Sequence, residues 1–399
     1  MRRERPQDLA WVIDDAIPLT PSLSALLGNV TALPGRDITA SALRHADGLL
    51  VRSVTRVDEA LLDGAQLRFV GSATAGVDHI DTECLVQRGI PWAAAPGSNA
   101  IAVVEYVLSA LALSGYLEKA LKGAPVGLVG LGEVGSQLLN RLSRLGCRVL
   151  VFDPMRAMWP AGIDSSSLDA VLSCPIVSLH ANLHDKPPHA SRHLIDSRAV
   201  ERLLRSSVVR GDPGVLINAA RGELVCPRAL DQLLDSPWRV ILDTWPTEPA
   251  MSAAVLSRAD WVSPHIAGHS VQAKLRGSNM LAAAIAAHWQ VEPPSGASEP
   301  SVAAPLTDVS SGDSAMNIAA APDASEAWVI SFLLGQGTLE HADRNVRAAA
   351  SPHLSAQAFD ALRKSYRQPE EWTGRSIKIS GSAPAATHWA TRLGLNVIP

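Results

Sequence analysis

The sequence lacks an excess of basic residues. Its 35 lysine and arginine residues are outnumbered by 39 acidic residues, which gives a formal net charge of -4 at pH 7. No lysine- or arginine-dense face is evident, so nothing indicates a contact with nucleic acid. An anionic small molecule would have to be bound by a few local arginines.

Cysteine is scarce and forms no metal-binding pattern. Four cysteines stand far apart, without a CxxC pair, at Cys84, Cys147, Cys174 and Cys226. Such spacing is typical of reduced thiols in a cytosol. Histidines 180, 184, 189 and 193 lie closer together, but Pro187-Pro188 breaks any helix that could align them. We therefore expect no metal.

The sequence also lacks an apolar run long enough to span a membrane, which takes about 20 residues. Glu105 interrupts the best candidate, and the short run from Leu9 to Ile13 is followed by two aspartates. We expect no membrane segment and no export signal, and hence a cytoplasmic protein. The 399 residues leave room for two or three domains.

A glycine-rich stretch between a predicted strand and a predicted helix is the most informative part of the chain. Val126 to Val129 has the character of a buried strand and runs into Gly130-Leu-Gly-Glu-Val-Gly135. Strand, GxGxxG and helix in this order are typical of a dinucleotide-binding turn. Gly130 permits the turn, Gly132 lets the backbone approach a pyrophosphate, and Gly135 lets helix and strand pack. Methyltransferases use similar turns, so other residues must identify the cofactor.

The residue after the next predicted strand favours NAD. Cys147 to Phe152 reads as that strand, and Asp153 follows it where an acidic residue binds a ribose 2'-hydroxyl. A carboxylate here would repel a 2'-phosphate, which disfavours NADP. Arg156 lies close enough to keep NADP open as an alternative.

Strand and helix patterns alternate along most of the chain, which predicts parallel sheets covered on both faces. In the first part the predicted strands are Ala10–Ile13, Gly48–Arg52, Leu67–Gly71 and Pro91–Ala95. In the second they are Val126–Val129, Cys147–Phe152, Ile176–Leu179, Val215–Asn218, Arg239–Asp243 and Trp261–Ser263.

We therefore predict an α/β protein with two doubly wound parallel-sheet (Rossmann-like) domains and a small α/β C-terminal domain. The predicted divisions are a substrate domain at 1–98 and 267–290, an NAD-binding domain at 99–266, a linker at 291–322, and the C-terminal domain at 323–399. The linker is predicted from its proline, serine and small polar residues.

Arg221, Glu248 and His265 follow three predicted strands of the second domain, at the sheet edge where ligands bind. Oxidising a 2-hydroxy acid requires a base for the hydroxyl proton while hydride leaves the same carbon. Imidazole suits that task, a carboxylate can orient the imidazole, and a guanidinium can hold the substrate carboxylate. Arg221 could instead cap a loop, Glu248 could be a solvated turn residue, and His265 could be structural, but their joint placement favours chemistry.

The motifs around these residues resemble those of the D-isomer-specific 2-hydroxyacid dehydrogenases and, more closely, the erythronate-4-phosphate dehydrogenase family. The matching segments are Val51–Thr55, Gly71–His79, Ala95–Tyr106, Asn218–Gly222, Asp243–Pro249, Pro264–Gly268, Phe359–Tyr366 and Glu371-Trp372. The last two belong to a tail that the wider superfamily lacks, so they are the most discriminating.

The resemblance implies catalytic roles for Arg221 and Glu248, with His265 as proton acceptor or donor. It implies substrate contacts at Ser53, Thr74 and His269, and NAD contacts at Asp153, Ala181, Ala219, Ala220, Asp243 and Gly268. The C-terminal part would form a homodimer interface. Arg52 is our candidate for binding a substrate phosphate, with Arg56 a possible helper.

Three positions depart from the family pattern. Ala181 stands where the family usually has threonine, which would remove one cofactor hydrogen bond. Ala220 stands where the family has a cysteine; the backbone atoms make the cofactor contact there, so we expect this change to be harmless. His269 stands in place of a substrate-binding tyrosine. The imidazole of His269 can still donate a hydrogen bond, so we expect this change to alter the affinity for substrate and not the activity.

We expect the chain to oxidise 4-phospho-D-erythronate to 3-hydroxy-2-oxo-4-phosphonooxybutanoate with NAD, a step in pyridoxal 5'-phosphate (vitamin B6) synthesis. Two alternatives stay open. One is a related dehydrogenase acting on another acid, such as glycerate or phosphoglycerate. The other is an NAD-sensing binding protein that reuses the fold.

Overall fold

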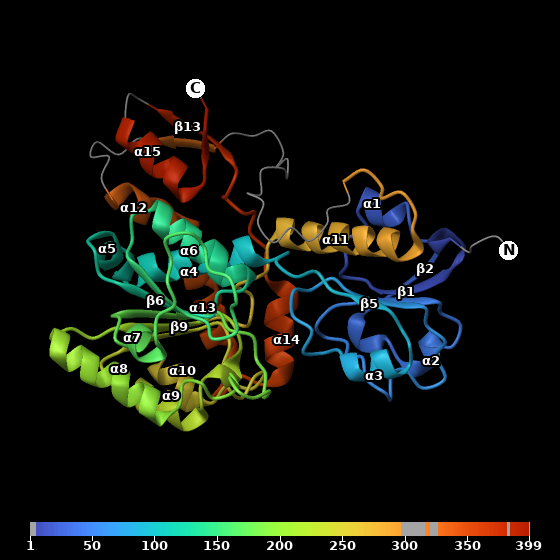
Figure 1. The fold of residues 1–399 in the computed structure, drawn as a ribbon, viewed down its shortest axis with the longest axis horizontal. Coiled ribbons are helices and arrows are strands. Elements are labelled where there is room, and N and C mark those ends of the chain that lie inside the picture. Colours follow the sequence, from blue (N-terminus) through green and yellow to red (C-terminus); the bar gives the residue numbers. More distant parts are fainter. Residues whose placement is uncertain (1–4, 297–315, 320–325, 381–383, 399) are drawn as a thin grey trace. The chain divides into compact units, whose positions relative to one another are not determined.

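The computed structural model of the protein describes residues 5–296, 316–319, 326–380 and 384–398 (Figure 1). The described residues of Met1–Ala100 and His269–Pro305 pack into a first unit, and those of Ile101–Gly268 and Leu306–Pro399 into a second. No helix in this described part is long and apolar enough to cross a membrane.

The first unit is built on a parallel sheet with the strand order β2-β1-β3-β4-β5. The strands are β1 (Ala10–Asp14), β2 (Asn29–Leu33), β3 (Gly48–Val51), β4 (Phe69–Ser72) and β5 (Trp92–Ala93). Helices α1 (Pro21–Ser24) and α11 (Val271–Trp289) cover one face, and α2 (Ala40–Leu43) and α3 (Thr82–Gln87) the other (Figure 1). Each face has its own buried apolar cluster, as expected for a doubly covered sheet.

Strand β2 is absent from the sequence-based prediction. It lies at the edge of the sheet, and its first four residues are exposed. Its polar-apolar alternation covers only the four residues 29–32 and no apolar run accompanies it, so the strand signal is weak.

The second unit contains a parallel sheet in the order β11-β10-β9-β8-β6-β7. Its strands are β6 (Val126–Val129), β7 (Val149–Phe152), β8 (Ile176–Leu179), β9 (Val215–Asn218), β10 (Arg239–Leu242) and β11 (Trp261–Val262). Its helices are α4 (Ala100–Leu113), α5 (Tyr116–Leu121), α6 (Glu133–Arg144), α7 (Leu168–Leu172), α8 (Ser197–Arg210), α9 (Pro227–Leu234) and α10 (Ala253–Arg258). From β6 the chain goes to β7 on one side and then to β8 on the other. Ligands of such sheets bind at the carboxyl ends of the strands at this switch point.

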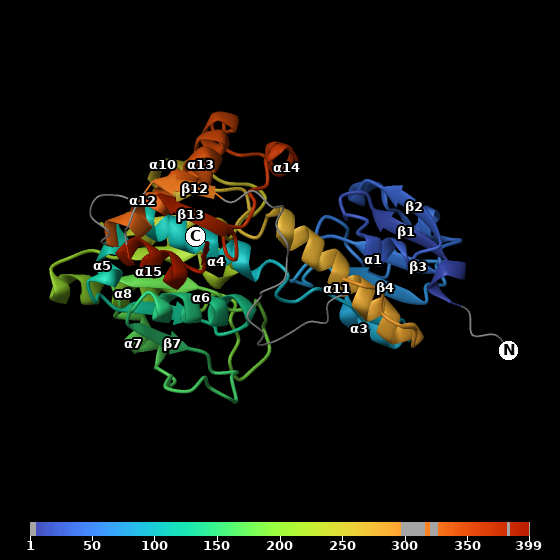
Figure 2. The ribbon, with the colours of Figure 1, turned by 90° about the horizontal axis from the view of Figure 1, so that it is seen from above.

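The C-terminal stretch adds helices and a small sheet to the second unit. The helices are α12 (Glu326–Gln336), α13 (Thr338–Ala349), α14 (Ala356–Ser365) and α15 (Pro384–Leu393), and the strands are β12 (Met316–Ala319), β13 (Ser376–Ser380) and β14 (Asn396–Val397). The sheet β12-β13-β14 lies with α12 and α15, whereas α14 lies apart from it in both views (Figures 1 and 2).

Glu105 of α4 attaches this stretch to the rest of the unit. Its buried carboxyl accepts hydrogen bonds from the backbone N–H groups of Trp372 (3.2 Å) and Thr373 (2.7 Å). Burial, followed by the nearby carboxyl of Glu371, raises the pKa of Glu105 to about 8. The acidic residue that interrupts an otherwise apolar helix is therefore a docking point.

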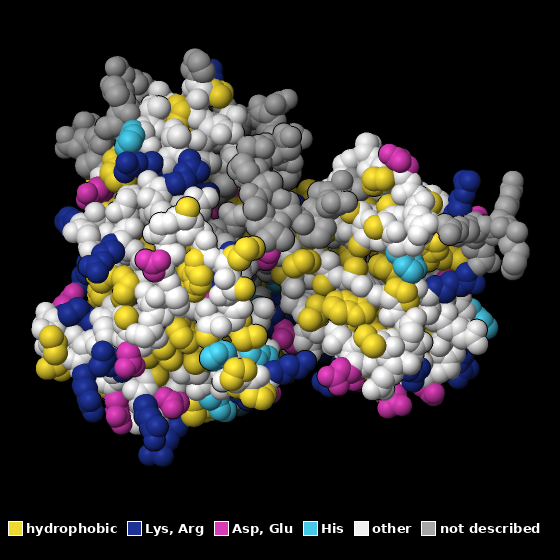
Figure 3. Space-filling view, in the orientation of Figure 1, with side chains coloured by type: hydrophobic (Ala, Val, Ile, Leu, Met, Phe, Trp, Pro, Cys, Tyr) yellow, Lys and Arg dark blue, Asp and Glu magenta, His cyan; other side chains and the backbone are white. Residues whose placement is uncertain are grey.

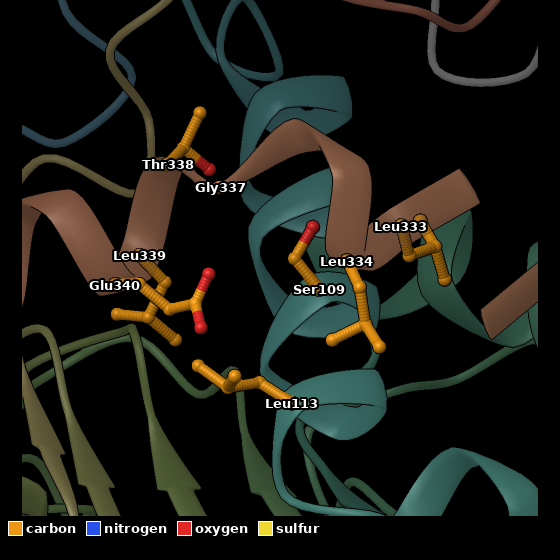
Figure 4. A pocket seen from close by; sticks show the side chains of 8 residues that line it. All are labelled: Ser109, Leu113, Leu333, Leu334, Gly337, Thr338, Leu339 and Glu340. Atoms are coloured by element: carbon orange, nitrogen blue, oxygen red, sulfur yellow. The ribbon is translucent and has the colours of Figure 1, made fainter. Parts of the chain in front are cut away.

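Where α4 meets the turn between α12 and α13, a dent of about 10 Å³ is left (Figure 4). Ser109 and Leu113 of α4 face Leu334, Gly337 and Leu339 across it. A space of this size holds at most about one water molecule. The dent is therefore a packing seam and not a ligand site.

Two parallel α/β sheets with a small C-terminal sheet confirm the predicted fold class. The finer division, with its boundaries at residues 98, 266 and 322, stays a prediction. Most of the linker predicted at 291–322 lies outside the described residues, and β12 falls within that range.

Candidate active site

The turn after β6 has the shape that a dinucleotide requires. Gly130 has a φ of +96°, and a Cβ there would lie 2.5 Å from the backbone N of Ala181. A Cβ on Gly135 would lie 2.1 Å from the carbonyl oxygen of Gly130, so α6 packs directly on the turn. A Cβ on Gly132 would meet no atom of the described residues within 4 Å. This open side, at the N-terminus of α6, is where a pyrophosphate would be held.

A cavity of about 430 Å³ adjoins this turn. Its lining includes Gly130 and Asp153, together with Ala181, His184 and His189 of the loop that follows β8. Histidine side chains lie beside apolar ones on the loop-bearing part of the second unit in Figure 3. The volume falls within the range of about 300–1,000 Å³ that is usual for ligand pockets.

Asp153 ends β7 and holds the turn together. Its Oδ2 accepts the backbone N–H of Leu131 (2.7 Å), and its Oδ1 accepts that of Met155 (3.0 Å). Each carboxylate oxygen keeps a lone pair for a ribose hydroxyl. Arg156 is engaged by carbonyl groups, since its Nε donates to Met158 (2.8 Å) and its Nη1 to Leu131. This arrangement favours a 2'-hydroxyl over a 2'-phosphate.

His180 lies buried beneath the cavity, with its Nε2 2.8 Å from the Oγ of Ser178. Burial lowers the pKa of His180 to about 4, so the folded protein keeps this imidazole neutral. The sequence alone does not indicate that His180 is buried and neutral, because its burial depends on how the loop after β8 packs.

We expect the protein to lose stability below the ordinary histidine pKa because of His180. The unfolded chain binds a proton near pH 6.5 and the folded chain near pH 4, so stability falls as pH drops through that window. The loss is on the order of 3 kcal/mol at its limit. Urea unfolding at about pH 7 and about pH 5 measures it. His180→Gln should flatten the difference between the two conditions; an unchanged pH dependence would contradict this assignment.

Arg221 follows β9 in a turn fixed by the side chain of Asn218. The Asn218 Nδ2 donates to the carbonyl of Arg221 (2.9 Å), and its Oδ1 accepts the backbone N–H of Ala220 (3.2 Å). Gly222 then approaches Trp245 so closely that a Cβ would lie 1.9 Å from the Trp245 carbonyl oxygen. The turns after β9 and β10 are therefore in direct contact.

Glu248 and His265 meet in a hydrogen bond of 2.6 Å between Oε1 and Nδ1. Their side chains are 24% and 34% exposed, so a substrate can reach them. His265 has a φ of +54°, and its backbone N–H donates to the carbonyls of Asp243 (2.9 Å) and Ser263 (3.0 Å). Because the carboxylate engages Nδ1, Nε2 is the nitrogen that can exchange a proton with a substrate.

Asp243 shapes the loop that presents His265. Its carboxylate accepts hydrogen bonds from the hydroxyl of Ser263 (2.6 Å) and from the backbone N–H groups of Ile266 (2.8 Å) and Ala267 (3.0 Å). The hydroxyl of Tyr106 lies 2.7 Å from that of Ser263. Burial raises the pKa of Asp243, and the nearby His265 opposes that rise. Sequence reasoning missed Ser263 and Tyr106, although both adjoin or end recognised motifs.

The remaining predicted cofactor residues follow these strands. Ala219 and Ala220 form the turn before Arg221, and Gly268 follows the loop bound by Asp243. The second unit thus holds every predicted catalytic and cofactor residue. Among the described residues, no cluster of three or more histidine, cysteine, aspartate or glutamate side chains could hold a metal ion.

The predicted substrate residues lie in the first unit, namely Arg52, Ser53, Thr74 and His269. Ser53 is exposed and the other three are half-buried. The Thr74 hydroxyl lies 2.7 Å from that of Ser72 and donates to the carbonyl of Gly76 (3.0 Å).

Lys274, in the first turn of α11, is a cation that sequence reasoning missed. Burial, followed by the charge of Arg52, lowers the pKa of Lys274, while Asp14 acts in the opposite direction. Arg52 and Lys274 therefore lie close enough for their charges to interact, and the carboxyl of Asp14 lies near both of them.

Comparisons with known proteins show the family to which the chain is similar. The family model described as the catalytic domain of D-isomer specific 2-hydroxyacid dehydrogenases matches residues 23–368. The chain is 36% identical over 397 residues to the erythronate-4-phosphate dehydrogenase of Cellvibrio japonicus (strain Ueda107), covering 97% of this chain and 99% of that protein. It is 38% identical over 399 residues to that of Klebsiella pneumoniae (strain 342), covering 97% and 98%.

Solved structures share the fold. An NAD+-bound 3-phosphoglycerate dehydrogenase of Entamoeba histolytica aligns with a TM-score of 0.57 at 19% identity, covering 71% of this chain and 94% of that one. A D-lactate dehydrogenase of Aquifex aeolicus, complexed with NAD and lactic acid, aligns with a TM-score of 0.55 at 18% identity, covering 70% and 95%.

Proposed function

The chain belongs to the D-isomer-specific 2-hydroxyacid dehydrogenases and, among them, to the erythronate-4-phosphate dehydrogenases, and we propose that it oxidises 4-phospho-D-erythronate to 3-hydroxy-2-oxo-4-phosphonooxybutanoate. This reaction serves pyridoxal 5'-phosphate (vitamin B6) synthesis. The observation that carries the proposal is the 2.6 Å hydrogen bond between His265 and Glu248, which follow β11 and β10 of the sheet whose strand β6 leads into the dinucleotide turn.

His265 removes the proton from the 2-hydroxyl group through Nε2. The imidazolium that results is stabilised by the Glu248 carboxylate at Nδ1, which also fixes the ring orientation. Arg221 holds the substrate carboxylate through two parallel hydrogen bonds of its guanidinium. As this proton leaves the hydroxyl oxygen and a hydride leaves C2 for the nicotinamide, the C2–O bond becomes a carbonyl and a 2-oxo acid results.

The cofactor is NAD, which supplies the hydride acceptor when bound. The glycine turn at 130–135 accommodates its pyrophosphate, and Asp153 accepts a hydrogen bond from its ribose. Ala181, Ala219, Ala220, Asp243 and Gly268 are the other proposed contacts. The open side of Gly132 and the cavity of about 430 Å³ support this fit.

The substrate phosphate is bound by the first unit. Arg52 and Lys274 provide two neighbouring cations, and Ser53, Thr74 and His269 provide polar contacts. These residues favour binding of a phosphorylated acid over an acid that carries no phosphate, because each half-buried cation forms a charge-assisted hydrogen bond with the phosphate.

A panel of acids tests the proposed substrate. With NAD present, NADH absorbance gives kcat/KM for 4-phospho-D-erythronate, D-glycerate and 3-phospho-D-glycerate. We expect the four-carbon phosphorylated acid to have the highest value. A higher value for either glycerate compound would reassign the substrate.

A cytoplasmic homodimer is the proposed form of the enzyme. The C-terminal residues 323–399, which the wider superfamily lacks, are proposed as the dimer interface. The four cysteines are free, and two of them are buried, which suits a reducing compartment.

A further inference from the structure

Helix α13 contacts the segment that leads to His265. The Oδ1 of Asp343 accepts the backbone N–H of Val262 in β11 (2.9 Å), three residues before His265. The carboxylate also binds Nε of Arg347, at 3.0 Å from Oδ1 and 2.8 Å from Oδ2. The side chain of Asp343 is only 13% exposed, so these contacts are shielded from water.

The guanidinium of Arg347 completes this contact. Its Nη2 donates to the carbonyls of Ala259 (2.9 Å) and Asp260 (3.3 Å), and its Nη1 to that of Leu256. These carbonyls lie at the C-terminal end of α10 and in the link to β11, where a helix leaves its last carbonyls without internal partners. A charged donor fixed by Asp343 therefore holds the chain just before the His265 loop.

The same C-terminal stretch also contacts the segment that carries Glu248. Met251 and Leu354 exchange two backbone hydrogen bonds, of 3.1 and 3.0 Å, and both side chains are buried. On the other side of Glu248, the ring of Trp245 packs edge-to-face on Phe359 of α14, with centroids 5.6 Å apart. Glu248 thus lies between two attachment points to residues 354–359.

We propose that residues 338–365 act as a brace that sets the catalytic pair, with Asp343 and Arg347 as positioning residues for His265 and Leu354 and Phe359 as positioning residues for Glu248. The Nδ1–Oε1 distance of 2.6 Å depends on two loops that are 17 residues apart. Both are fixed to this one stretch of chain. The brace gives the C-terminal stretch a part in catalysis that is separate from any dimer interface, and it rests on the proposed roles of Glu248 and His265.

Loosening the brace should slow the chemical step and leave cofactor binding intact. A displacement of about 1 Å from a distant substitution can cost about 10²-fold in rate. For Asp343→Leu, which is nearly isosteric but accepts no hydrogen bond, we expect kcat to fall about 10- to 100-fold. The Kd for NAD, from quenching of tryptophan fluorescence, should change less than about twofold. Asp343→Asn keeps an acceptor for the Val262 N–H and should recover most of the rate.

A matched control removes a contact of the same kind elsewhere. Arg144 of α6 donates from Nη2 to the carbonyl of Thr391 in α15 (2.7 Å), far along the chain from both catalytic loops. Arg144→Ala should leave kcat within about twofold of the unaltered enzyme. An equal loss of kcat in this control would overturn the brace, because the loss of any contact of the C-terminal stretch would then be enough to lower kcat.

The rate-limiting step provides the second readout. With substrate deuterated at C2, the isotope effect on kcat should be at least as large in Asp343→Leu as in the unaltered enzyme. An unchanged kcat, or a parallel loss of NAD binding, would overturn the proposal. If Asp343→Leu does not fold, Phe359→Leu decides by the same measurements. Failure of the unaltered enzyme to form NADH would instead overturn the proposed function.

Discussion

Replacing His265 with glutamine should lower kcat/KM for 4-phospho-D-erythronate by about 10²- to 10⁴-fold, the usual contribution of a general base. Glutamine can still hydrogen bond to Glu248, but it cannot accept the hydroxyl proton. The 2.6 Å contact between Nδ1 and Oε1 leaves Nε2 as the working nitrogen. Initial rates of NADH formation measure the loss.

The accompanying controls separate catalysis from folding. NAD binding to His265→Gln should match that of the unaltered enzyme, because the glycine turn and Asp153 are untouched. Glu248→Gln should cause a smaller loss, since it removes the charge that stabilises the imidazolium and keeps an acceptor for Nδ1–H. Turnover by His265→Gln within about tenfold of the unaltered enzyme would assign the proton transfer to another group.

Exchange of Arg221 for lysine should cost about 1–3 kcal/mol of transition-state binding, or about 5- to 150-fold in kcat/KM. Lysine keeps the positive charge but loses the planar fork that binds a carboxylate through two bonds. The turn itself should survive, because Asn218 holds it through the backbone of residues 220 and 221.

Arg228→Lys is the matched control for this exchange. Arg228 lies exposed on α9, seven residues further along the chain, and the same change there should leave kcat/KM unaltered. If Arg221→Lys is equally silent, the guanidinium does not hold the carboxylate.

Local sequence was sufficient wherever one segment carries its own signal. The strand, glycine turn and helix at 126–142 require only adjacent residues, so β6 and α6 appear where the pattern predicts them. Most strands of the second sheet consist mainly of buried apolar residues, which makes them recognisable runs. The exposed edge strand β2 has no such run, and it was missed for that reason.

Contacts between segments that are distant in the sequence could not be predicted from local sequence patterns. Asp343 binds Val262 across 81 residues, and Arg347 binds Leu256 across 91. The buried state of His180 and the nearness of Lys274 to Arg52 likewise depend on how separate elements pack.

The sequence by itself determined the fold class, the dinucleotide turn and the residue types of the proposed chemistry, because periodicity and strand-end position are local properties of the chain. Tertiary structure alone decided that Glu248 and His265 share a hydrogen bond and that the C-terminal helices hold both of their loops. A hydrogen bond requires a separation set to tenths of an ångström. Only the packed arrangement of all the intervening elements fixes a distance that closely.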